Sequence, residues 1–243
     1  ARVAAARSIC YACAVAADLA EASPDADVRA AAKLREDLLT PIAKAWSSDM
    51  GVEVASMGVQ VHGGMGFMNE TLAAQLYRDS RIAPIYEGTN GIQAIDLVGR
   101  KLSGTNGESM RVMLGEIEAS AAAARATNDP QLVQIADRLR AAAEALREAS
   151  DWMLAQMKSR DQDKALAGAT AYLALAGDVI GGHFLTRAAV AARSSDGAAR
   201  ARRLALAGFF AETALASAPG RVAGITEGGS RFLDNSEALF GIA

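Results

Sequence analysis

Several residue types are scarce in this chain, and each shortage narrows the choice of fold. Aromatic residues make up 5% of its 243 residues, and only five residues are proline. Because alanine is abundant and proline is rare, the composition favours helix. No segment shows the period-two alternation of a strand. The sequence therefore predicts an all-α protein.

A basic block is also absent. Net charge is −3, and together these two features argue against nucleic acid or an anionic membrane as a partner. With 51% hydrophobic and 22% charged residues, the chain can form one or two globular domains. No signal peptide is recognisable. Since the chain opens at Ala1 inside a helical pattern, we expect it to be a piece of a longer polypeptide.

Cysteine is limited to one Cys-x-x-Cys pair, Cys10 and Cys13. Such a pair can be a redox dithiol or half of a zinc site. Here it lies in an alanine-rich helical run, with no second cysteine pair and no flanking strand. We therefore interpret the pair as two small apolar thiols on one helix face, in a reducing compartment.

The first part of the chain is predicted to form long helices. Apolar residues three and four apart predict an amphipathic helix over residues 1–22. A proline-containing turn ends it, and Asp25 or Asp27 is expected to cap the next helix. Pro41 should break or kink that helix and leave residues 42–61 as its last segment. Core positions expected there are Trp46 and Met50.

Residues 103–107 are small, polar and glycine-rich, which makes them the best internal boundary. This boundary separates a first helical domain, 1–103, from an additional helical domain, 108–243. Behind Pro130, which suits a first helical turn, the second domain carries an apolar seam typical of a bundle helix. The seam consists of Leu132, Ile135, Leu139, Ala142, Leu146, Ala149 and Met153.

The stretch from 165 to 192 is apolar almost all round. A membrane span needs such a run, but Asp178, His183 and Arg187 interrupt it, so we expect a helix buried at the centre of a bundle. His183 is expected to be a hydrogen-bonded core residue. A last long helix is predicted over residues 198–216. The tail beyond it carries candidate docking anchors, namely Phe232, Leu233, Leu239 and Phe240.

The segment from Gln60 to Lys101 contains features that a core alone does not require. Gly63, Gly64 and Gly66 remove Cβ atoms from one turn, so the backbone can take a positive φ or approach a ligand closely. The Gln60 amide, just before them, can donate and accept hydrogen bonds at once. This turn is therefore a candidate binding site.

A single carboxylate, Glu87, follows in an apolar-flanked turn between Tyr86 and Gly88. Two interpretations are open. Burial beside the apolar flank would raise the pKa of such a carboxyl and make it a base useful near neutral pH. Alternatively, Glu87 caps the helix that begins near Thr89 or Asn90, because a negative charge is favoured at a helix N-terminus.

The helix between these two features is expected to begin at Asn69, as its N-cap, and to run to about Ser80. Arg78 and Asp79 lie near its end. On their own they are as well explained by a solvated surface turn as by a function.

In order and spacing, these motifs resemble those of the acyl-CoA dehydrogenases, flavoenzymes that take a proton and a hydride from the α and β carbons of an acyl-CoA. The family pattern is Gln-x-x-Gly-Gly-x-Gly-aromatic, then Arg-Asp, then Ile-Tyr-Glu-Gly-Thr and Ile-Gln. Its counterparts here are Gln60 to Phe67, Arg78-Asp79, Ile85 to Thr89 and Ile92-Gln93. The strong part of the resemblance covers residues 31–102.

The resemblance implies an all-α fold, an up-and-down helical bundle of the acyl-CoA dehydrogenase C-terminal type followed by a second helical bundle. The extra bundle resembles the large bacterial subgroup that includes the methylmercaptopropionyl-CoA dehydrogenases, so a bacterial cytoplasmic location is expected. Glu87 would be the catalytic base, and Gly88 would lie at the mouth of the acyl site. Gly91 replaces a glutamine or glutamate of many members, so that contact to the flavin is expected to be absent. The residues implied to contact FAD, in the family often across a subunit interface, are Gln60, Gly63, Gly64 and Thr89.

The implied partners are an acyl-CoA substrate, a second copy of the chain in a homo-oligomer, and electron-transfer flavoprotein as electron acceptor. The N-terminal domains that complete the flavin and acyl sites in the family are missing here, so we expect this chain alone to be inactive. No metal is implied. Two alternatives remain: an acyl-CoA oxidase, which shares the base but passes electrons to oxygen, and a helical interaction module that has lost the chemistry.

Overall fold

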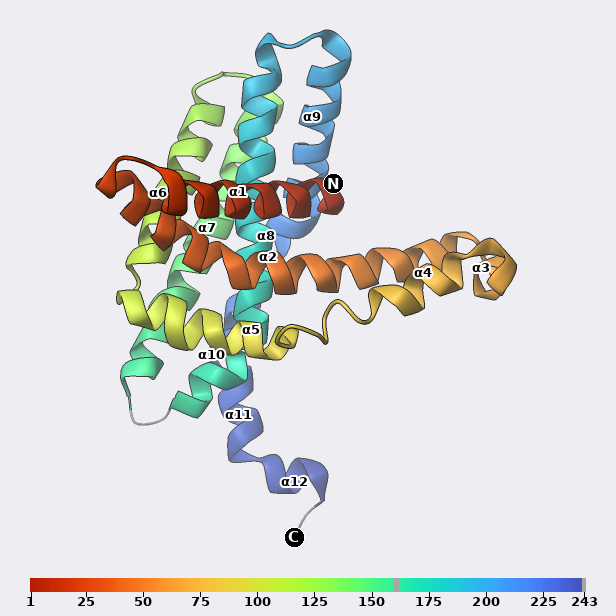
Figure 1. Ribbon diagram of the computed structural model, residues 1–243, viewed down its shortest axis with the longest axis vertical. Coiled ribbons are helices and arrows are strands. Elements are labelled where there is room, and N and C mark those ends of the chain that lie inside the picture. The colour runs from red at the N-terminus through yellow and green to blue at the C-terminus, as the bar shows by residue number, and fades with distance from the viewer. Residues whose placement is uncertain (160–161, 242–243) are drawn as a thin grey trace.

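Figure 1 shows upright helices crossed by a pair from the N-terminal half, in a computed structural model that describes residues 1–159 and 162–241. The crossing pair is α1 (Arg2–Ala22) and α2 (Ala26–Val61). Asp25 caps α2 as predicted, because its carboxylate accepts from two backbone N–H groups of the first turn. The described residues contain no strand, which confirms the all-α prediction.

Pro41 does not break α2, which corrects the prediction of a separate segment from residue 42. Proline removes one intrahelical hydrogen bond. The helix continues because Pro41 lies in a buried apolar face that tertiary packing holds in place. The neighbours in that face are at most 1% exposed: Leu38, Leu39 and Ile42. Trp46 and Met50 are buried, as predicted.

Met50 is the last buried residue of α2, and beyond it the helix leaves the body as an arm, residues 51–80 (Figure 1). The short α3 (Gly64–Phe67) lies at the tip of the arm, and α4 (Ala73–Ser80) returns along α2. Only small alanine side chains of α4 are buried. The arm therefore has a thin core and a large exposed surface.

Asn69 is not the N-cap of the returning helix, which corrects that prediction. It opens a 3-10 turn, and Leu72, with φ +62°, takes the N-cap position of α4. The chain reverses too tightly for an ordinary capped start, and the Asn69 side chain is engaged elsewhere. Its Oδ1 accepts from Arg78 Nη2 at 3.3 Å. Arg78 and Asp79 are both exposed.

After the arm, α5 (Asn90–Asp96) runs into a π-helical turn (Leu97–Leu102) and a 3-10 turn (Ser103–Thr105). Two left-handed residues, Asn106 and Gly107, complete the reversal. The glycine-rich boundary of the sequence thus coincides with a sharp turn. The division into two domains at this point stays a prediction.

The bundle beyond this turn contains the helices with the longest apolar faces. Every residue of the predicted seam on α7 is at most 3% exposed, which confirms that seam. The elements are α6 (Glu108–Arg125), α7 (Pro130–Lys158), α8 (Gln162–Ala191), α9 (Gly197–Phe210) with a π-helical continuation (Ala211–Leu215), α10 (Val222–Thr226), α11 (Gly228–Asp234) and α12 (Ser236–Phe240).

By length and composition, α1 and the helical stretch Gln162–Ser194 would be able to cross a membrane. Of the apolar window in the second, 67% is buried inside the protein, against 22% for α1. This burial confirms α8 as the central helix of the bundle. One hydrophobic cluster includes residues of α1, α2, α5, α6, α7, α8 and α9, so the core is continuous across the predicted boundary.

The cysteine thiols face hydroxyl groups of α2. Cys10 Sγ lies 3.7 Å from Ser47 Oγ, and Cys13 Sγ lies 3.5 Å from Thr40 Oγ1. Both thiols are free, and burial raises the pKa of Cys13. Among the residues that the structure describes, no cluster of three or more metal-ligating side chains occurs. The pair is therefore part of the α1–α2 contact.

His183 is buried as predicted, but it is not hydrogen-bonded, which corrects that part of the prediction. Within the described chain, neither ring nitrogen has a hydrogen-bond partner. Nε2 lies 3.9 Å from Glu116 Oε2. Burial, together with the positive charges of Arg187 and Arg35, lowers the pKa of His183 to about 3. The imidazole is therefore neutral in the folded protein at neutral pH.

This buried histidine should make the chain acid-sensitive. The unfolded state takes up the proton near an ordinary pKa of about 6.5, while the folded state resists it down to about 3. Stability is therefore lost as pH falls from 6.5 towards 3, by about 1.4 kcal/mol per pH unit. We expect the free energy of unfolding, measured with urea, to fall by about 2 kcal/mol between pH 7.5 and pH 5 from this group.

His183→Leu should remove most of that pH dependence. His62→Leu is the matched control: it replaces the other histidine of the chain, which is exposed, and leaves His183 in place. If His183→Leu and the unaltered chain lose the same stability between the two pH values, the protonation of His183 is not the cause.

Candidate active site

Glu87 lies on the loop that joins the arm to α5. Its φ is +55° and that of Gly88 is +80°, so two successive residues are left-handed. Against the prediction of burial, Glu87 is exposed in this chain. Its carboxylate makes no hydrogen bond or ion pair with the described residues. Burial of this side chain would need groups that do not belong to this chain.

The helix-cap interpretation of Glu87 is not met either. Thr89 takes the N-cap position of α5, and no side chain makes a capping hydrogen bond there. The backbone of the loop is closed by hydrogen bonds from Tyr86 N to Ile82 O at 3.1 Å and from Asn90 N to Pro84 O at 3.0 Å. The carboxylate is therefore presented to the outside by an ordered loop.

The glycine turn at the tip of the arm has distinct requirements at each position. Gly63 has φ +61°, a conformation that favours glycine. A Cβ at Gly66 would lie 2.2 Å from the carbonyl oxygen of Val59, so the close approach of α3 to α2 requires glycine there. At Gly64, a Cβ would meet no atom within 4 Å and the φ is ordinary. This chain alone gives no reason for glycine at position 64.

Gln60 lies just before this turn, and its exposed side chain makes no hydrogen bond to the described residues. Thr89 is exposed too, close to Glu87. The two groups of predicted site residues lie apart. The loop contacts Lys44 of α2, and Gln60 is sixteen residues further along the same helix, about 24 Å at 1.5 Å per residue. One copy of the chain therefore does not bring Gln60 and Glu87 together.

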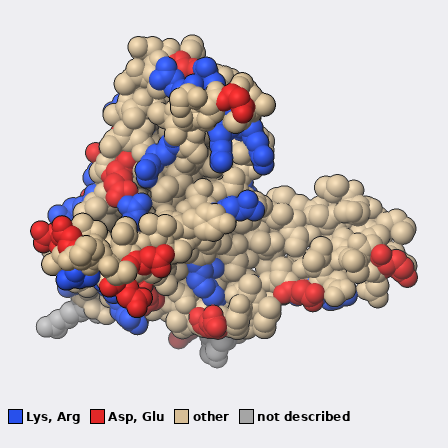
Figure 2. Space-filling view, turned by 45° about the horizontal axis from the view of Figure 1, so that its top comes forward, with Lys and Arg blue, Asp and Glu red and all other residues tan. Residues whose placement is uncertain are grey.

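The surface around both groups is apolar. Large side chains of the arm and its tip are exposed, with Val61 at 85% and Phe67 at 80%. Figure 2 shows the arm as surface with few charged side chains. The exposed apolar residues of the arm are Met57, Val61, Met65, Phe67, Met68, Leu72, Leu76 and Tyr77. Such a concentration of exposed apolar side chains is typical of an interaction surface.

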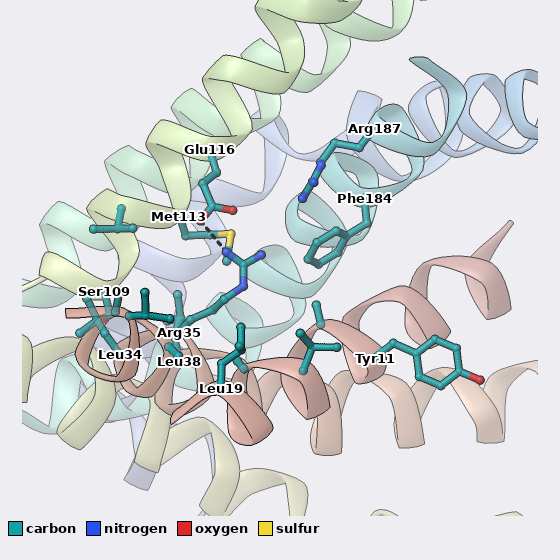
Figure 3. A pocket seen from close by; sticks show the side chains of 17 residues that line it. Tyr11, Leu19, Leu34, Arg35, Leu38, Ser109, Met113, Glu116, Phe184 and Arg187 are labelled. Carbon is teal, nitrogen blue, oxygen red and sulfur yellow. Dashed lines mark hydrogen bonds and ion pairs between the residues drawn. The ribbon is translucent and has the colours of Figure 1, made fainter. Parts of the chain in front are cut away.

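A separate apolar hollow of about 600 Å³ lies between α1, α2, α6 and α8. Figure 3 shows Arg35 paired with Glu116 across it and Arg187 above Phe184. Glu87, Gln60 and the glycine turn do not line it. The hollow is thus not part of the candidate active site.

Sequence reasoning missed residues of α2 that contact the Glu87 loop. Lys44 Nζ donates to the Gly88 carbonyl at 2.8 Å, and Ser48 contacts the side chain of Asn90. Their spacing of four places both on one face of α2. That spacing is the only signal in the sequence, and it does not say what the face contacts.

The helical arm, its glycine turn and the exposed carboxylate loop define the class, a C-terminal helical domain of acyl-CoA dehydrogenase type. Two family models match: "Acyl-CoA dehydrogenase, C-terminal domain" over residues 1–103 and "Acetyl-CoA dehydrogenase C-terminal like" over residues 113–235. The chain belongs to the acyl-CoA dehydrogenase family, which confirms the resemblance of its motifs.

A relative in sequence agrees with this assignment, and two solved structures share the fold. The 3-methylmercaptopropionyl-CoA dehydrogenase of Ruegeria pomeroyi is 38% identical over 231 residues, covering 90% of this chain and 38% of that enzyme. The crystal structure of Caenorhabditis elegans ACDH-11 in complex with C11-CoA has a TM-score of 0.75 at 21% identity, covering 98% of this chain and 38% of that one. An acyl-CoA dehydrogenase complexed with FAD from Bacillus anthracis has a TM-score of 0.64 at 19% identity, covering 91% and 40%. The chain thus spans about two fifths of the length of these relatives.

Proposed function

We propose that this chain is the C-terminal part of an FAD-dependent acyl-CoA dehydrogenase, which introduces an α,β double bond into an acyl-CoA thioester. The holoenzyme, as the term is used below, is this chain preceded by the N-terminal segments that its relatives have and loaded with FAD. The observation that carries the proposal is the Glu87 loop. It presents a carboxylate with no partner in the described chain, from a backbone conformation that the surrounding structure maintains.

In this mechanism an oxygen of Glu87 removes the α-proton of the thioester, the electrons of that C–H bond form the double bond, and a hydride leaves the β carbon. FAD, when bound, supplies the acceptor for that hydride. The α-proton is weakly acidic, so the base must be held at the reacting carbon rather than merely be present. Gly88, next to it, allows the substrate to approach the backbone at the mouth of the acyl site.

The fit of the glycine turn to a cofactor rests on Gly64 and Gln60. The space where a Gly64 Cβ would lie is open, so a ligand can approach the backbone there, and the Gln60 amide has both a donor and an acceptor to offer. With Gly63 and Thr89, these residues would contact FAD. Because Gln60 lies about 24 Å along α2 from Lys44, which contacts the Glu87 loop, one flavin site would combine the turn of one copy with the loop of another.

The apolar arm supports the same assembly. Covering its exposed side chains with a second copy or with the N-terminal segments would remove a large apolar surface from water. We therefore propose a homo-oligomer, with acyl-CoA as substrate and electron-transfer flavoprotein as acceptor. The isolated chain should be inactive. Oxygen consumption by the holoenzyme with acyl-CoA would instead identify an oxidase.

Gly64 and Gly66 form a pair of variants that separates folding from cofactor binding. Gly66→Ala places a methyl group against the Val59 carbonyl, so it should destabilise the arm by about 1–3 kcal/mol in the chain alone. In the isolated chain, Gly64→Ala should leave the hydrogen-exchange rates of the arm amides unchanged. In the holoenzyme, however, Gly64→Ala should weaken FAD binding by about tenfold or more, or about 1.4 kcal/mol.

Flavin content after dialysis and hydrogen exchange of the arm measure the two effects. Normal FAD retention by Gly64→Ala would show that the cofactor does not approach the backbone at this turn.

A further inference from the structure

The conformation of the Glu87 loop needs an explanation beyond its own sequence. Glu87 is a non-glycine residue at φ +55°, followed by Gly88 at φ +80°. Side chains other than glycine adopt this region at a cost, and such residues persist only where the surroundings hold them. Within the loop, the Glu87 carbonyl accepts only a long contact, 3.4 Å from Gln93 Nε2. Backbone hydrogen bonds close the loop before and after Glu87, and further restraints come from side chains of α2.

Lys44 provides the first of these restraints. Its ammonium group donates to the Gly88 carbonyl at 2.8 Å and to Asn90 Oδ1, also at 2.8 Å. Within the described chain, Lys44 forms no ion pair with a carboxylate, so its charge is directed to neutral oxygens of the loop. Hydrogen bonds from a charged donor are shorter and stronger than neutral ones. Lys44 thus binds the loop at Gly88, the residue that follows Glu87.

Asn90 extends the same restraint. The two N–H groups of its Nδ2 have three acceptors within hydrogen-bond distance: Asp49 Oδ1 at 2.7 Å, Ser48 Oγ at 2.9 Å and the Ala45 carbonyl at 3.1 Å. Its Oδ1 accepts from Lys44, so the amide is engaged on both sides. Asn90 is also the first residue of α5. The loop is therefore fixed to one face of α2 immediately after Glu87.

We propose that Lys44 is a positioning residue: it holds the Gly88 carbonyl and Asn90 so that Glu87 is presented at one place to the α carbon of the substrate. This inference rests on the proposed function of Glu87 as the base. Lys44 itself touches neither substrate nor flavin. Proton abstraction depends on near-attack geometry, so loosening the loop should slow the chemical step more than it weakens the binding of substrate and cofactor, which Gly88 and Thr89 of the same loop would contact.

The test uses Lys44→Met, which keeps a chain of similar length and removes the ammonium group. Lys33→Met is the matched control, because Lys33 is also on α2 and, among the described residues, forms ion pairs with Glu36 and Asp37 of its own helix rather than with the loop. In the 243-residue chain, we expect hydrogen exchange at the amides of Tyr86 and Asn90 to become at least about tenfold faster in Lys44→Met. Lys33→Met should leave it unchanged.

In the holoenzyme, Lys44→Met should slow the bleaching of FAD by acyl-CoA at least about tenfold. The FAD content and the acyl-CoA concentration at half-maximal rate should change by less than the bleaching rate does. Lys44→Arg, which restores a donor, should recover part of the rate. If Lys44→Met does not fold, Asn90→Ala, which removes one of the two Lys44 contacts, is measured in the same two ways.

Faster loop exchange with normal bleaching would make Lys44 merely structural and overturn the proposal. Slower bleaching with unchanged loop exchange would overturn it too, because Lys44 would then act on the reacting groups directly. Failure of the proposed function is seen separately: Glu87→Gln would bleach at the normal rate even where Lys44→Met loosens the loop.

Discussion

Glu87→Gln should lower the rate of acyl-CoA dehydrogenation by the holoenzyme by a factor on the order of 10² to 10⁴, the range typical of a general base. Glutamine keeps the shape of the side chain and removes the basic oxygen. The loop should keep its conformation, because its restraints act on the Gly88 carbonyl and on Asn90 rather than on the Glu87 carboxylate. Bleaching of the bound flavin by acyl-CoA, followed by stopped flow, measures the effect.

Two controls define that result. Glu70→Gln removes another exposed carboxylate, on the arm, and should leave the bleaching rate unchanged. Gln60→Ala should do the reverse of Glu87→Gln, lowering FAD content while the loaded fraction reacts at close to the normal rate. Bleaching of Glu87→Gln at the rate of the unaltered enzyme would show that the carboxylate is not the base.

The sequence alone predicted the parts of the fold that periodicity controls. The α7 seam and the central burial of α8 follow from spacings of three and four residues, because a helix places such residues on one face. Periodicity does not show where tertiary packing compensates for a proline, and this is why the break expected at Pro41 was wrong. The left-handed Leu72 before α4 was missed for a related reason, since a leucine carries no local signal for that conformation.

The candidate site was predicted as residue types but not as geometry. Glu87 and the glycine turn are conspicuous in the sequence, yet the predicted burial of Glu87 depends on surroundings that this chain does not supply. The contact between Lys44 and the loop joins residues far apart in the sequence, so no local pattern announces it. The absence of a hydrogen-bond partner for His183 is likewise a tertiary property.

The second large effect is expected at Trp46, where α2 packs against α8. Trp46 is 7% exposed, and its Nε1 donates to Asp178 Oδ1 at 3.2 Å. Trp46→Ala should lower the free energy of unfolding by about 3–5 kcal/mol, the usual cost of truncating a buried aromatic residue. The substitution also removes the hydrogen bond from Trp46 to the Asp178 carboxylate and keeps the one from Arg221. Burial raises the pKa of this carboxyl group. Urea unfolding followed by circular dichroism measures the change.

Gly177→Ala tests whether the packing of the Trp46 indole against α8 causes that loss of stability. A Cβ there would lie 2.3 Å from Trp46 Cγ, so Gly177→Ala should destabilise the chain by about 1–3 kcal/mol. Gly115→Ala, in open space on α6, should instead stabilise it by about 0.5–1 kcal/mol. In the Trp46→Ala background, Gly177→Ala should cost far less, because the added methyl group then lies next to the space the indole filled. Additive costs would contradict this packing.

The unfolding of Trp46→Ala should also show whether the chain unfolds as one unit. In the sequence, α2 precedes residues 103–107 and α8 follows them, yet both contribute to one hydrophobic cluster. Trp46→Ala should therefore shift a single unfolding transition of the whole chain. A transition that splits in two would show that the segments on either side of that turn fold independently.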